Sequence, residues 1–168
     1  MNKIQAACSR IHEAYTKFGG ALFLGHSGGK DSCVIHQLAN TVASNLLIVH
    51  TPKPSTHPKT VEFLYNLAVS NTIMMVPSDK MEAFVASHSL RCQIDGTRID
   101  EANRKDGRST TFVQNNVNKS RTEMSHFVEN GLFGLSMVYP IFDWTDDEVF
   151  DYIKSHNIPL SEEYVLVF

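Results

Sequence analysis

The sequence predicts an α/β protein in which a parallel sheet carries helices on both of its faces. Short apolar runs of strand length alternate along the chain with segments whose apolar residues recur every three or four positions, as in amphipathic helices. A glycine-rich segment, residues 27–32, lies directly between the first apolar run and the helix that follows it. The 168 residues are 42% hydrophobic and show no internal repeat or linker. We therefore expect a single domain over residues 1–168.

The expected elements alternate from the N-terminus onward. Gly19 and Gly20 end the first helix, and Thr145 with Glu148 forms a capping box that begins the last one. The polar segment 103–121 is expected to be a loop. Helices are expected over residues 3–18, 31–43, 58–69, 79–88 and from 146 onward, and strands over 21–24, 46–50, 72–77, 90–94 and 135–141.

Composition narrows the class of protein. The formal net charge of −3 gives no bulk basic field, so nucleic acid is not an expected partner. No apolar run approaches the roughly 20 residues that span a bilayer, and the N-terminus lacks the apolar core of a signal peptide. We expect a cytoplasmic protein that does not bind membranes. Cys8, Cys33 and Cys92 are scattered and include no CxxC pair, so neither zinc nor an iron–sulfur cluster is expected.

The strongest chemical signal is a loop of six residues: Ser27, Gly28, Gly29, Lys30, Asp31 and Ser32. Glycines let the backbone approach a phosphate closely, and the amides and dipole of a helix start favour an anion. Lys30 adds a positive charge, and Asp31 could hold Mg²⁺ or cap the helix. It is not a Walker loop, because Asp31 follows the lysine and Leu24 stands where the first glycine would be required. The alternative is a tight turn without a ligand.

These six residues resemble the loop of the PP-loop ATP pyrophosphatases. Residues 96–101 with Arg104 look like the Gly-x-Arg-x-x-Glu stretch of one branch, which includes phosphoadenylyl-sulfate (PAPS) reductase, the small subunit of ATP sulfurylase, and FAD synthase. Residues 140–153 are similar to the same branch's segment around a tryptophan, and Tyr164 follows as its tyrosine does. Residues 57–60 match more loosely.

The resemblance implies a Rossmann-like sheet of the adenine nucleotide α-hydrolase type, with ATP or PAPS/APS at the carboxyl edge of the first two strands. It also implies chemistry at the α-phosphate or sulfonucleotide end, with Lys30 and Arg98 as the catalytic residues and Mg²⁺ at Asp31. Gly96, Thr97 and Arg98 would bind the anion beside the loop. An arginine fork matches phosphate and sulfate oxygens. The alternative for Arg98 is a surface salt bridge to Asp100 or Glu101.

The polar segment after residue 102 could close over the nucleotide as a lid. Its basic residues include Arg104, Arg108 and Arg121, which could contact a polyanionic tail. The alternative is a solvated loop. Trp144 could stack on a base, although a core position is more usual for a tryptophan before a helix.

Two departures from the branch affect the expected chemistry. The reductases carry a nucleophilic cysteine in a C-terminal Glu-Cys-Gly motif, whereas this sequence has no cysteine beyond Cys92. His50 stands where the family has an acidic residue at the end of the second strand. The sequence therefore predicts a protein of the PAPS reductase group that binds an adenine nucleotide. It leaves open a sulfurylase- or FAD-synthase-type adenylyltransferase and a non-catalytic nucleotide-binding module, as well as a homo-oligomer or a partner subunit.

Overall fold

The computed structural model of the protein describes residues 1–43, 45–70, 72–102 and 126–165. The lid residues Arg104, Arg108 and Arg121 lie outside these ranges.

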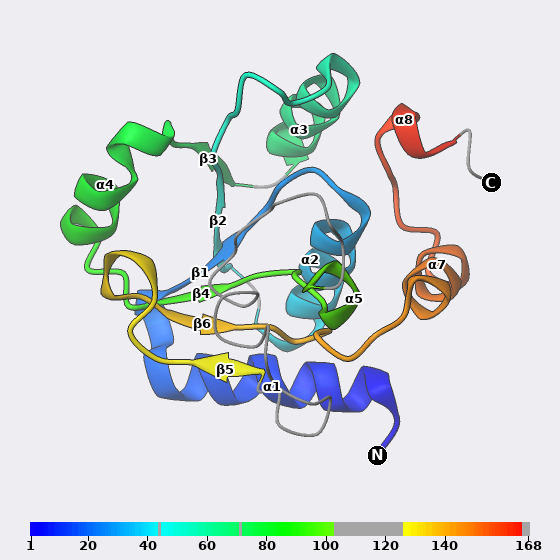
Figure 1. Cartoon of the computed structure of the whole chain (residues 1–168), viewed down its shortest axis with the longest axis horizontal. Coiled ribbons are helices and arrows are strands. Elements are labelled where there is room, and N and C mark those ends of the chain that lie inside the picture. Colours follow the sequence, from blue (N-terminus) through cyan, green and yellow to red (C-terminus); the bar gives the residue numbers. More distant parts are fainter. Residues whose placement is uncertain (44, 71, 103–125, 166–168) are drawn as a thin grey trace.

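The described residues contain a six-stranded sheet in the order β3-β2-β1-β4-β6-β5 (Figure 1). All neighbouring strands are parallel except β5, which runs antiparallel to β6. The predicted parallel sheet is thus confirmed. β5 was not predicted, because two residues are too few to form an alternating pattern. The strands are β1 (Leu22–Gly25), β2 (Leu47–His50), β3 (Ile73–Met75), β4 (Cys92–Ile94), β5 (Phe127–Val128) and β6 (Ser136–Val138).

The long helices begin and end where the sequence predicts. Gly19 ends the first with a φ of 53°, and Thr145 begins α7 with the predicted capping box to Glu148. The α-helices are α1 (Lys3–Phe18), α2 (Lys30–Val42), α3 (Pro58–Ser70), α4 (Met81–Ser87), α5 (Ile99–Ala102), α7 (Asp146–Ser155) and α8 (Glu162–Val165). Three 3₁₀ turns are η1 (Gly19–Ala21), η2 (Ser78–Lys80) and η3 (Leu132–Gly134).

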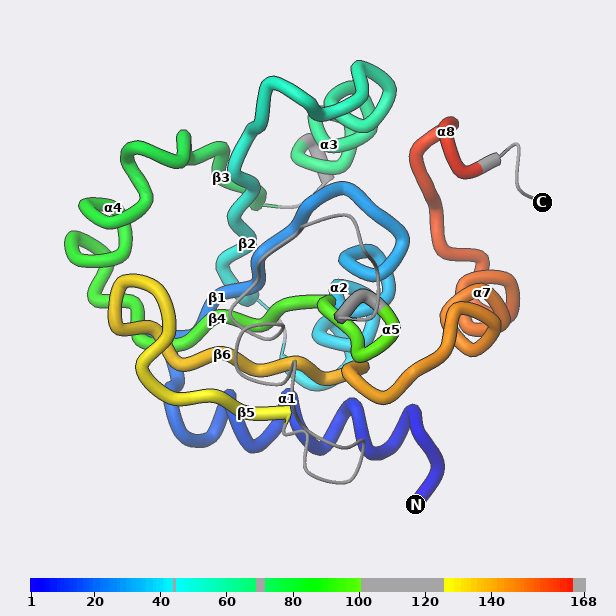
Figure 2. The backbone as a smooth tube through the Cα atoms, viewed as in Figure 1, coloured from blue at the N-terminus to red at the C-terminus, as the bar shows by residue number. Residues whose placement is uncertain are grey.

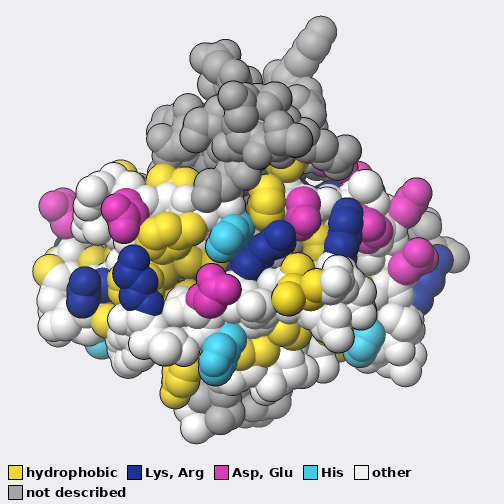
Figure 3. Space-filling model, turned by 90° about the horizontal axis from the view of Figure 1, so that it is seen from below, with side chains coloured by type: hydrophobic (Ala, Val, Ile, Leu, Met, Phe, Trp, Pro, Cys, Tyr) yellow, Lys and Arg dark blue, Asp and Glu magenta, His cyan; other side chains and the backbone are white. Residues whose placement is uncertain are grey.

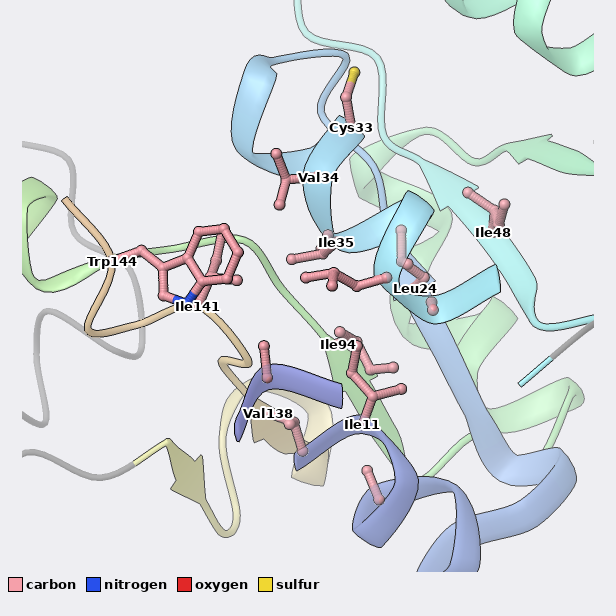
Figure 4. Close-up of a cluster of buried hydrophobic side chains, with 14 of the residues drawn as sticks. Ile11, Leu24, Cys33, Val34, Ile35, Ile48, Ile94, Val138, Ile141 and Trp144 are labelled. Atoms are coloured by element: carbon pink, nitrogen blue, oxygen red, sulfur yellow. The ribbon is translucent and has the colours of Figure 1, made fainter. Parts of the chain in front are cut away.

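Two apolar clusters hold helices against opposite faces of the sheet. Alternate residues of β1 divide between them, since Leu22 and Leu24 belong to one cluster and Phe23 to the other. The larger cluster joins α1, α2 and α7 to the sheet and includes the residues labelled in Figure 4. The smaller cluster packs α4 and Ile99 of α5 on the other face. Each buried aliphatic side chain contributes about 1.5–3 kcal/mol, so these clusters fix the strand ends that form the site.

None of the described helices combines the length and the hydropathy needed to cross a membrane. On the face seen in Figure 3, Lys and Arg side chains are interspersed with Asp and Glu side chains.

Candidate functional site

A cavity of about 370 Å³ opens at the carboxyl ends of β1, β2 and β4. β2 and β3 lie on one side of β1, and β4 and β6 lie on the other. The strand order therefore reverses direction at β1. In open α/β sheets such a switch point is where ligands bind. The cavity walls come from the loop after β1 (Ser27, Gly29, Lys30, Asp31, Ser32), the end of β2 (His50, Thr51, Lys53), the end of β4 (Asp95, Gly96, Thr97) and Tyr164.

The first three amides of the loop are paired with side chains of the loop or of His26, the residue before it. The Ser27 amide donates to Ser32 Oγ at 3.0 Å, and the Gly29 amide donates to Ser27 Oγ at 3.2 Å. The Gly28 amide donates to Nδ1 of His26 at 3.0 Å. In contrast, the amides of Asp31 and Ser32, at the start of α2, have no acceptor among the described residues. An anion at this helix start would therefore meet two unpaired N–H groups and the two serine hydroxyls.

Gly28 is required by the conformation of the loop. Its φ is +85°, and a Cβ at this position would lie 2.4 Å from Cγ2 of Thr60 in α3. A side chain here would meet both backbone strain and a steric clash.

His26, a buried residue that the sequence analysis did not single out, supports the loop by accepting the Gly28 amide. Because its Nδ1 accepts from the Gly28 amide, the ring is neutral with its proton on Nε2. Burial, followed by the nearby His36 and His50, lowers the pKa of His26 to about 3. The neutral ring is therefore kept as an acceptor across the physiological range.

Two cations and two carboxylates form a compact network behind the start of α2. Arg98 donates from Nε to Asp31 at 3.0 Å and from Nη2 to Asp146 at 2.6 Å. The Lys30 ammonium lies 3.3 Å from a carboxylate oxygen of each of the same two aspartates. Burial opposes the charge on Arg98, but its pairs with Asp31 and Asp146 outweigh that effect and raise the pKa of Arg98. The network fixes the first turn of α2 to the first turn of α7.

Arg98 is fully buried, with 0% of its side chain exposed. Its Nη1 does lie 3.8 Å from a carboxylate oxygen of Asp100, but the guanidinium is buried, so the alternative of a surface salt bridge is wrong about the surface position. Nη1 also donates to the carbonyl of Trp144 at 3.1 Å. Arg98 lies behind the cavity wall, since its side chain is not among those that line the cavity. Trp144 is 2% exposed and belongs to the core.

Of the predicted site residues, the structure brings seven to the cavity wall: Ser27, Gly29, Lys30, Asp31, Ser32, Gly96 and Thr97. Gly28 lies in the same loop, with Thr60 and Leu64 of α3 nearest to its Cβ position. Gly96 lets the two halves of the site approach, since a Cβ there would lie 3.1 Å from the Asp31 backbone carbon.

Polar residues outside the predicted binding set also line the cavity. The carboxylate of Asp95 accepts from the Thr97 amide at 2.8 Å and from the Thr97 hydroxyl. Burial raises the pKa of Asp95 despite these donors. His50 stands opposite with Nδ1 2.8 Å from the His26 carbonyl oxygen, and Lys53 follows β2. The position of Asp95 directly after a strand was the signal that could have identified it.

No described group of three or more His, Cys, Asp or Glu side chains is arranged to hold a metal ion. Asp31 offers one carboxylate at the loop, and each of its oxygens already accepts from Arg98. Cys33 and Cys92 are buried, and burial raises the pKa of each thiol to about 12. Neither thiol is therefore a ready nucleophile.

The sequence matches the family model described as the phosphoadenosine phosphosulfate reductase domain over residues 75–165. The chain belongs to this family. The matched range includes Gly96, Arg98, Asp146 and Tyr164, while the loop at residues 27–32 lies before it. No curated protein matches the sequence.

Solved structures with the same fold include a PAPS reductase from Candida auris in a phosphate complex. It is 11% identical with a TM-score of 0.71, covering 97% of this chain and 85% of that one. An FMN adenylyltransferase from Candida glabrata in complex with ATP is 15% identical with a TM-score of 0.74, covering 96% and 57%. Yeast FAD synthetase in complex with FAD is 12% identical with a TM-score of 0.71, covering 96% and 60%. The chain thus spans less than two thirds of the FMN adenylyltransferase and of the FAD synthetase. All three relatives belong to the PP-loop superfamily.

Proposed function

We propose that the protein binds an adenine nucleotide, ATP or PAPS/APS, with its phosphate or sulfonucleotide end at the start of α2. The observation that carries this proposal is the pair of unpaired amides at Asp31 and Ser32, which adjoin a cavity of about 370 Å³. Cavities of this size hold ligands of nucleotide scale. The wall around them supplies Lys30 and the hydroxyls of Ser27 and Ser32.

In this proposal each part of the site has a separate task. The amides and hydroxyls bind the anion, while Lys30 balances charge that develops at the α-phosphate. Arg98 acts as a positioning residue, because it holds Asp31 and Asp146 rather than the ligand. Asp31 is the carboxylate that would hold Mg²⁺ brought in by the nucleotide phosphates, through the lone pairs that its bonds from Arg98 leave free.

Adenylyl transfer fits the site better than thiol-dependent reduction, because the two cysteines nearest the sheet are buried with raised pKa values. An adenylyltransferase needs no thiol: an acceptor oxygen would form a bond to the α-phosphorus while the bond to pyrophosphate breaks. A module that binds the nucleotide without turnover remains the alternative to both enzymes.

Calorimetric titration with ATP, PAPS and APS, each with and without Mg²⁺, tests the binding step. We expect at least one of the three to bind with a 1:1 stoichiometry, and absence of binding by all three would contradict the proposal. Pyrophosphate release from ATP with an acceptor present would identify the transferase. Sulfite release from PAPS or APS would identify the reductase, and binding without product would identify the module.

A further inference from the structure

Tyr164 reaches from α8 to the same helix start where we place the anion. The Tyr164 hydroxyl oxygen lies 3.3 Å from the position that a Cβ on Gly29 would occupy, beside the backbone amide of Lys30. Tyr164 also lines the cavity. A neutral phenol oxygen thus stands at the helix start where an anion at α2 would bind.

Two polar contacts hold α8 against α3, and Figure 2 shows these distant segments side by side. The hydroxyl of Thr60 donates to Glu163. The ammonium of Lys59 lies 3.1 Å from a carboxylate oxygen of Glu162. The second contact is between exposed groups, so it stabilises the docked position only weakly. We call these two contacts together the α8 latch.

The charges of α8 oppose an anion at this place. Glu162 and Glu163 precede Tyr164 directly, and the Glu163 and Asp31 carboxylates add to burial in raising the pKa of the Tyr164 phenol. The phenol therefore stays neutral, and a phosphate oxygen would make the stronger, charge-assisted hydrogen bond to the Lys30 amide. A polyphosphate would thus outcompete the phenol and repel the nearby Glu163 carboxylate.

We propose that Tyr164 is a displaceable cap on the phosphate site, which the phosphate end of the ligand expels together with α8. This inference rests on the proposed function. Binding then includes the cost of breaking the Lys30–Tyr164 contact and the α8 latch. The protein would in this way couple occupancy of the phosphate site to release of α8 from α3.

The test compares pyrophosphate binding by the full chain and by Tyr164→Phe, which keeps the ring and removes the competing oxygen. We expect Tyr164→Phe to bind pyrophosphate about three- to tenfold more tightly, because the polar oxygen that stands at the anion's position is gone. Thr60→Val, which loses the latch hydroxyl but keeps the methyl beside Gly28, should shift affinity in the same direction. Tyr65→Phe is the matched control, because Tyr65 is 60% exposed on α3, and its affinity should equal that of the unchanged protein.

Equal or weaker binding by Tyr164→Phe would overturn the cap and leave the phosphate site standing, with Tyr164 as a ligand contact. If neither the unchanged protein nor Tyr164→Phe binds pyrophosphate, both the cap and the proposed function fail.

Hydrogen exchange provides a second readout that affinity alone does not give. We expect pyrophosphate to speed exchange of the amides in residues 161–165 while it slows exchange at the start of α2. Slower exchange in residues 161–165 would contradict displacement, because it would mean that the ligand draws α8 closer.

Discussion

The two sides of the loop at residues 27–32 differ in how they are held. On the cavity side, the amides of the loop have partners only within the loop or none among the described residues; these are the amides of Ser27, Gly29, Asp31 and Ser32. On the core side, His26 and Arg98 are buried and hydrogen-bonded to the loop and to the first turn of α2. We therefore expect substitutions on the core side mainly to lower the stability of the fold, and substitutions on the cavity side mainly to weaken nucleotide binding.

The largest expected effect is on the core side. Arg98→Ala would leave Asp31 and Asp146 facing each other without their shared arginine, and removing one partner of a buried ion network costs about 3–5 kcal/mol. We expect the free energy of unfolding, measured by urea denaturation, to fall by about this amount, with nucleotide binding lost as well. Arg91→Ala, at an exposed arginine, should change stability by less than about 0.5 kcal/mol. A stable Arg98→Ala protein would show that the network does not support the fold.

Lys30→Ala tests the cavity side. Arg98 still pairs with both aspartates in this variant, so we expect only a modest loss of stability. Loss of a charge-assisted contact should weaken ATP or PAPS binding about 10- to 100-fold. Calorimetric titration, with Lys80→Ala as the control at an exposed lysine that does not line the cavity, checks this. A loss of stability as large as that of Arg98→Ala would erase the distinction between the two sides.

The pH dependence of stability sharpens the role of His26. Its pKa is about 3 in the folded protein and about 6.5 when unfolded, so the unfolded state binds more protons between these values. The contribution of neutral His26 to stability is therefore present above about pH 6.5 and is lost as the pH falls toward 3. His50 and His126, whose pKa values burial also lowers, act in the same direction.

Thermal melts of His26→Asn between pH 4 and 8 should show a melting temperature that falls less steeply with decreasing pH than that of the unchanged protein. The reason is that each unit by which the fold lowers a pKa corresponds to about 1.4 kcal/mol of pH-dependent stability. The exposed His12 offers the control His12→Asn, whose profile should match that of the unchanged protein. Identical profiles for all three would mean that His26 is not held neutral by the fold.

The smallest effect is expected at the buried thiols. Cys33→Ser and Cys92→Ser should leave nucleotide affinity and any turnover within about twofold, with a stability loss of roughly 1–2 kcal/mol from placing a hydroxyl in an apolar site. Loss of turnover in either variant, at a temperature where it remains folded, would show that the substituted thiol takes part in the reaction.

The sequence predicted best what local patterns encode. The run Ala21–Leu24, the glycine loop and the helix after it are contiguous, and Thr145 with Glu148 caps its own helix, so the phosphate loop and α7 could be located. The burial of Arg98 could not be predicted from the sequence, since its partners Asp31 and Asp146 lie 67 and 48 residues away. Only the fold brings Asp31 and Asp146 together, and only α8 packing on α3 brings Tyr164 to the loop. In the sequence Asp146 is only an acidic residue in the first turn of a helix, whereas in the structure it pairs with Lys30 and Arg98.

The most direct test of the phosphate site is the backbone amide spectrum of the protein during titration with pyrophosphate. The account predicts that the N–H resonances of Asp31 and Ser32, the two unpaired amides at the start of α2, shift furthest, with Lys30 close behind as Tyr164 leaves it. Shifts concentrated away from α2, or no shift at millimolar pyrophosphate, would contradict it.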